Sequence, residues 1–92
     1  MMNKPCIPLT LYMRRGCHLC EDMQQQIHEL LEVGSYSLKL IDIDADPALK
    51  ARFNEWVPVL VHADQEICHH FLDLKALRAA QAGYNTSIDC SL

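Results

Sequence analysis

The sequence has no apolar run that approaches the length needed to cross a membrane, so we expect no membrane partner. Pro5 and Pro8 interrupt the short apolar stretch near the start, and no small-residue cleavage pattern follows, so we expect no signal peptide. The cysteine count of five is odd, which argues against a disulfide framework. These features favour a cytoplasmic protein with most thiols free.

An excess of positive charge is also missing. Eight Lys and Arg residues stand against 12 Asp and Glu, and the basic residues are scattered along the chain. This distribution indicates no nucleic-acid partner. With 92 residues, 50% of them hydrophobic and 22% charged, the chain has the composition of a globular protein. We predict one monomeric domain over residues 1–92, with a core at about 7–82 and a C-terminal tail at 83–92.

One CxxC pair, Cys17 and Cys20, lies between a strand-like segment and a helical apolar pattern. The first N–H groups of a helix lack intrahelical partners, and the helix dipole places partial positive charge there, which favours a thiolate. The position therefore predicts that Cys17 is nucleophilic. Arg14 and a protonated His18 would favour the thiolate further, whereas Glu21 would oppose it.

The remaining patterns predict an α/β protein with the element order βαβαββα. Strands are expected at 7–13, 37–43, 57–61 and 67–71. A hairpin turn over 63–66 is expected to join the last two strands. Asp46 and Asp73 are expected to cap the second and third helices, and Gly34 and Gly83 to end the first and third. The near-continuous apolar residues of the second strand predict burial on both of its faces.

These elements resemble the thioredoxin fold, and the small size resembles its glutaredoxin branch. The resemblance covers roughly residues 7–82 and implies a four-stranded mixed sheet flanked by helices. More narrowly, the chain resembles a family of small glutaredoxin-like CxxC proteins. The motifs that carry this resemblance are TLY at 10–12, GCHLCE at 16–21 and WVPV at 56–59.

The resemblance implies a thiol–disulfide oxidoreductase in which Cys17 is the nucleophile and Cys20 resolves. It also implies a cis peptide bond between Val57 and Pro58, with the Val57 backbone facing the thiols and binding an extended substrate. The implied partners are a disulfide-containing protein or small molecule, and a reductase or glutathione as electron source. The residues expected to support the site are Tyr12, Arg14, His18 and Asp73.

Two departures from ordinary glutaredoxins concern the site directly. His18-Leu19 replaces the usual Pro-Tyr between the cysteines. The Gly-Gly that precedes an acidic residue and binds the glutamyl end of glutathione is absent, because residues 68–73 read CHHFLD. Asp73 remains as an acidic group. We therefore expect no bound cofactor, and glutathione only as a candidate reductant.

The same CxxC pair leaves two other functional classes open. It could hold zinc or an iron–sulfur cluster as a metal-binding module, or it could act as the switch of a redox-sensing interaction domain. No second CxxC or HxxxH pair accompanies it, so we assign no metal ligands. The acidic run of Asp42, Asp44 and Asp46 is explained more simply by strand ends and helix capping than by metal binding.

Overall fold

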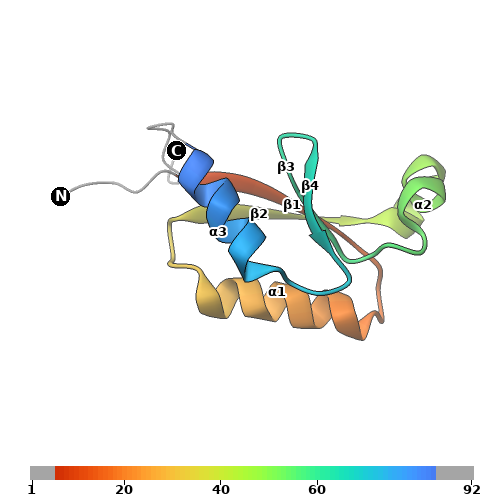
Figure 1. The fold of residues 1–92 in the computed structure, drawn as a ribbon. Coiled ribbons are helices and arrows are strands. Elements are labelled where there is room, and N and C mark those ends of the chain that lie inside the picture. Colours follow the sequence, from red (N-terminus) through yellow and green to blue (C-terminus); the bar gives the residue numbers. More distant parts are fainter. Residues whose placement is uncertain (1–5, 85–92) are drawn as a thin grey trace.

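The structure, a computed structural model, describes residues 6–84 and confirms the α/β architecture (Figure 1). The sheet has four strands in the order β2-β1-β3-β4, with β1 parallel to β2 and the other neighbours antiparallel. The elements are β1 (Ile7–Met13), α1 (His18–Leu30), β2 (Tyr36–Asp42), the 3-10 helix η1 (Ile43–Ala45), α2 (Pro47–Phe53), β3 (Val59–His62), β4 (Gln65–His69) and α3 (Leu74–Gly83).

The main hydrophobic core lies between the sheet and two helices. In Figure 1, α1 and α3 lie on one side of the sheet, and α2 lies apart from them beyond β2 and η1. Strand β1 turns every second side chain toward α1, because successive strand residues point to opposite faces. The buried members of this core are Ile7, Leu9, Leu11, Met23, Ile27, Leu31, Leu60, Cys68 and Leu77.

A smaller core joins the opposite face of the sheet to α2. Ile43, Phe53 and Val59 are its buried members, and Leu49 packs against them. Asp46 caps α2, since its Oδ1 accepts a hydrogen bond from the Ala48 N–H at 2.9 Å, as the sequence predicted. This second core fixes α2 beside the C-terminal end of β1.

The first helix ends earlier than predicted. Helix α1 stops at Leu30, and Leu31 is extended, with φ −97° and ψ 143°, while its N–H still bonds to the Ile27 carbonyl. Gly34, which was expected to end the helix, instead lies in the turn before β2 with φ 87°. Leu31 is buried, whereas Leu30, the last residue of the helix, is 44% exposed.

The prediction that the second strand is buried on both faces is wrong. Strand β2 pairs only with β1 and forms an edge of the sheet, where Leu40 is 43% exposed. Ile43 is fully buried, but it belongs to η1, which the sequence pattern did not reveal. An edge position depends on which strands pair, and the apolar run alone does not contain that information.

The last two strands are displaced from their predicted ranges. Strand β3 starts at Val59, because Val57 and Pro58 precede the ladder, and β4 runs over Gln65–His69, so Phe71 lies outside it and is 70% exposed. The hairpin turn is confirmed without a glycine, since Ala63 and Asp64 have φ of 51° and 63°. Two left-handed residues in succession match the strand twist of a tight hairpin.

Within the described range, no helix combines the length and apolar character needed to cross a membrane. The expected tail lies largely outside that range, as does Cys90. Three cysteines of the described range are free thiols, namely Cys17, Cys20 and Cys68.

Candidate active site

The CxxC pair lies where β1 leads into α1. Gly16, with φ 75°, makes the turn, and the Cys17 N–H bonds back to the Arg14 carbonyl at 3.3 Å. Cys17 is the N-cap of α1, and its Sγ accepts a hydrogen bond from the Cys20 N–H at 3.1 Å. A cysteine sulfur thus takes the position in which Ser, Thr, Asn or Asp usually satisfies the first N–H groups of a helix.

The two thiols differ sharply in their surroundings. Cys17 is partly exposed, whereas Cys20 is only 2% exposed. Burial, assisted by the hydrogen bond to Cys17, raises the pKa of Cys20 to about 12, and a backbone hydrogen bond with Arg14 opposes this rise. At neutral pH, Cys20 therefore keeps its proton while Cys17 is the thiol that solvent and ligands reach.

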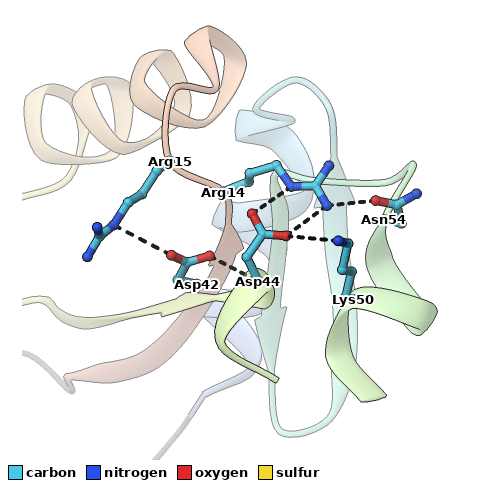
Figure 2. A network of polar contacts seen from close by, with 6 residues as sticks. All are labelled: Arg14, Arg15, Asp42, Asp44, Lys50 and Asn54. Atoms are coloured by element: carbon cyan, nitrogen blue, oxygen red, sulfur yellow. Dashed lines mark hydrogen bonds and ion pairs between the residues drawn. The ribbon is translucent and has the colours of Figure 1, made fainter. Parts of the chain in front are cut away.

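Arg14, expected to favour the Cys17 thiolate, is held by an acidic partner. Its guanidinium makes two hydrogen bonds to the Asp44 carboxylate, both of 3.0 Å, and one of 2.7 Å to Asn54 Oδ1 (Figure 2). The Lys50 ammonium lies 3.9 Å from the same carboxylate. The network neutralises much of the Arg14 charge and ties the turn before Cys17 to η1 and α2.

The acidic run is used for capping and ion pairing. Asp42 Oδ1 accepts a hydrogen bond from the Asp44 N–H at 2.9 Å, and Asp42 Oδ2 lies 3.6 Å from Nε of Arg15, which is 91% exposed. Figure 2 shows both contacts next to the Arg14 network. Within residues 6–84, no group of three or more His, Cys, Asp or Glu side chains is placed to hold a metal ion.

The other supporting residues lie in three different surroundings. His18 is 94% exposed, with its Nδ1 3.9 Å from Glu21 Oε2. The Tyr12 ring stacks on Phe53 with centroids 4.4 Å apart, on the α2 side of the sheet. Asp73 caps α3 through a 3.0 Å hydrogen bond from the Ala76 N–H to its carboxylate. The capping prediction for Asp73 is thus confirmed.

The Val57–Pro58 peptide bond is cis, as the resemblance implied. Because Tyr12 pairs with Val59 in antiparallel register, the segment before β3 lies at the same end of the sheet as the turn that carries Cys17. The Val57 N–H already donates to the Phe53 carbonyl at 3.2 Å, and the Pro58 carbonyl accepts from the His70 N–H at 2.9 Å. The backbone around the proline is therefore bonded on both sides within the chain.

The region that replaces Gly-Gly is filled by side chains. His70 has φ 64°, a left-handed conformation that glycine adopts without steric cost. Its imidazole hydrogen-bonds to the Glu55 carbonyl through Nε2 at 2.7 Å. The His69 Nδ1 lies 2.7 Å from Glu66 Oε2. Both imidazoles thus occupy positions where glycine would leave the backbone open.

A pocket that sequence reasoning missed opens on the α2 side of the sheet. Its volume is about 390 Å³, and neither cysteine of the CxxC pair lines it. The signal available in the sequence was the spacing of Arg52 and Trp56, which are four residues apart. That both side chains line one pocket depends on the fold. The lining residues are Tyr12, Arg52, Phe53, Trp56, Val59, Val61, Asp64, Glu66 and His69.

Solved structures of similar proteins support the architecture. Protein Ne2328 from Nitrosomonas europaea is 37% identical with a TM-score of 0.74, and the match covers 83% of this chain and 92% of that one. Protein XcR50 from X. campestris is 29% identical with a TM-score of 0.65, over 84% and 99% of the two chains. Glutaredoxin C1 from Populus tremula x tremuloides, 15% identical with a TM-score of 0.54 over 85% and 78%, shares the fold alone.

Sequence similarity leads to the same group. An uncharacterized protein of Mycobacterium tuberculosis is 29% identical over 83 residues, which cover 85% of this chain and 84% of that protein. Residues 8–80 match the family described as Glutaredoxin-like domain (DUF836). The fold is therefore thioredoxin-like, and the chain belongs to the glutaredoxin-like domain family.

Proposed function

We propose that this protein is a thiol–disulfide oxidoreductase that uses Cys17 as nucleophile and Cys20 as resolving thiol. The observation that carries the proposal is the asymmetry of the pair. Cys17 is partly exposed at the N-cap of α1 with its sulfur accepting a backbone N–H, whereas Cys20 is buried and protonated one helical turn away. Thiol–disulfide exchange needs one reactive thiolate and one thiol held in reserve.

In the proposed cycle, the Cys17 thiolate attacks one sulfur of a substrate disulfide. The substrate S–S bond breaks, its other sulfur leaves as a thiolate that takes up a proton, and a mixed disulfide with Cys17 forms. Cys20 then loses its proton and attacks the Cys17 sulfur, which releases the second substrate thiol and leaves a Cys17–Cys20 disulfide. Two electrons have passed from the protein to the substrate, and two electrons from a reductase or glutathione restore the dithiol.

The surroundings suggest how a substrate would approach. Val57 and Pro58 lie at the same end of the sheet as Cys17, and the Val57 N–H is occupied, so we propose that a substrate backbone uses the Val57 carbonyl. The substrate is a disulfide in a protein or small molecule, and we place the reaction in the cytoplasm, in a monomeric protein. Because His69 and His70 fill the region of the missing Gly-Gly, we propose glutathione as reductant and not as bound cofactor.

The test is the reduction potential of the pair, measured by equilibrating the protein in glutathione buffers and counting free thiols by mass. We expect a reversible two-electron couple between roughly −270 and −120 mV, the range of known exchange proteins. Cys17→Ser should abolish the couple, and Cys20→Ser should stop at a mixed disulfide on Cys17. A pair that forms no internal disulfide across this range would refute the proposal.

A further inference from the structure

The pocket on the α2 side of the sheet is separate from the thiols. Its floor is formed by Tyr12, Val59 and Val61, which project from β1 and β3 on the face opposite α1, since Tyr12 pairs with Val59. Its volume of about 390 Å³ falls in the usual range for small-molecule sites, roughly 300–1,000 Å³.

Aromatic side chains give this pocket firm walls. Trp56 is 48% exposed, and its ring is held by His69 in an edge-on contact at 5.1 Å and by the stacked ring of His70 at 6.0 Å. On the other side, Tyr12 and Phe53 stack at 4.4 Å with an interplanar angle of 24°. The pocket therefore offers flat apolar surfaces that are already ordered, which lowers the entropic cost of binding.

Two opposite charges in the pocket have no ion-pair partner within residues 6–84. The Arg52 guanidinium lies 4.8 Å from the centroid of the Phe53 ring, and within residues 6–84 it makes no ion pair. Asp64, in the β3–β4 turn, also has no hydrogen-bonded or ionic partner for its carboxylate within that range. The nearby Glu66 differs, because it bonds to His69 at 2.7 Å.

We propose that this pocket binds a small aromatic amino acid as a zwitterion. Its carboxylate would pair with Arg52, its ammonium group with Asp64, and its ring would lie against Trp56. An anion without an amine would be repelled by Asp64 and Glu66, and a cation without a carboxylate would leave Arg52 without an ionic partner. A dipolar ligand satisfies both free charges at once, and arginine suits a carboxylate because its fork of N–H groups can bind both oxygens.

The sequence provides its own reporter for this site. Trp56 is the single tryptophan of the chain, so fluorescence excited where only tryptophan absorbs reports on the pocket wall. We would titrate the full-length protein with L-phenylalanine, phenethylamine and 3-phenylpropionate, and follow backbone amide shifts by NMR in parallel. We expect saturable binding of L-phenylalanine, and binding at least about tenfold weaker for each analogue, which lacks one charge-assisted contact.

Two variants assign the charges. Arg52→Gln should weaken L-phenylalanine binding about tenfold and should not weaken phenethylamine binding, because that analogue has no carboxylate to lose a contact. Asp64→Asn should weaken L-phenylalanine binding and should not weaken 3-phenylpropionate binding, and asparagine tolerates the φ of 63° at this position. Lys75→Gln, on α3, is the charge-matched control and should change nothing.

Three results would overturn the inference. The first is the absence of saturable changes in both fluorescence and amide shifts, and the second is equal affinity for all three ligands. The third is an Arg52→Gln variant that loses phenethylamine as strongly as L-phenylalanine. Cys17→Ser should bind L-phenylalanine normally, so this inference and the proposed exchange activity can fail independently.

Discussion

Selective alkylation tests the unequal environments of the two thiols. Burial raises the pKa of Cys20 to about 12. A solution at pH 8 is therefore about four pH units below that pKa, and roughly one molecule in ten thousand carries the Cys20 thiolate. An ordinary cysteine, with a pKa of about 9, is roughly one tenth thiolate at that pH. Ionisation alone should therefore slow the reaction of Cys20 by about a thousandfold relative to a free cysteine, and its 2% exposure should slow it further.

The assay is a time course with iodoacetamide on the reduced, folded protein, read by peptide mass mapping. Among Cys17, Cys20 and Cys68, we expect rapid modification of Cys17 alone, since burial also raises the pKa of the Cys68 thiol. In urea, all three should react at similar rates, which controls for intrinsic reactivity. If Cys20 in the folded protein reacts as fast as Cys17, the buried, protonated state assigned to it is incorrect.

Three further predictions concern stability. The folded state holds the Cys20 proton up to about pH 12, whereas an unfolded cysteine loses it near pH 9. The free energy of unfolding, measured by urea titration, should therefore fall as pH rises between these values. In Cys20→Ala, it should depend less on pH over the same interval. Asp44→Asn removes one charge of the Arg14 pair and should cost roughly 0.5–1 kcal/mol by the same titration, whereas Asp22→Asn, on the exposed side of α1, should cost almost nothing. Leu11→Ala, fully buried in the main core, should cost about 2–5 kcal/mol, and a smaller loss would show that the core relaxes around it.

The first strand and the start of the first helix could be predicted closely, because the spacing of apolar residues and the position of the CxxC pair indicate the same boundary. The range of β1 and the beginning of α1 at the CxxC pair match the prediction, since the apolar pattern changes there from strand alternation to helical spacing. The caps at Asp46 and Asp73 were also predictable, because an aspartate directly before an apolar helical pattern commonly accepts a hydrogen bond from the first N–H groups of the helix.

Features set by distant pairing were not predictable. The start of β4 was placed two residues too late, because the turn uses Ala63 and Asp64 in place of glycine. The pairing of Arg14 with Asp44 joins residues 30 positions apart, so the sequence indicated a charge near Cys17 but not the carboxylate that pairs with it. The exposure of Leu40 depends on the edge position of β2, which no pattern within that strand encodes.

The sulfur cap of α1 connects helix stability to the redox state of the protein. In the dithiol form, the Cys17 sulfur accepts the Cys20 N–H at the helix start, and a thiolate there would be a strong acceptor facing the positive end of the helix dipole. Oxidation converts that sulfur into a neutral disulfide atom, which is a poorer acceptor. The capping hydrogen bond therefore stabilises the dithiol form more than the disulfide form. Each tenfold shift of that equilibrium toward the dithiol raises the reduction potential by about 30 mV. In the proposed cycle, the first turn of α1 would thus favour the reduced form of the pair over its disulfide.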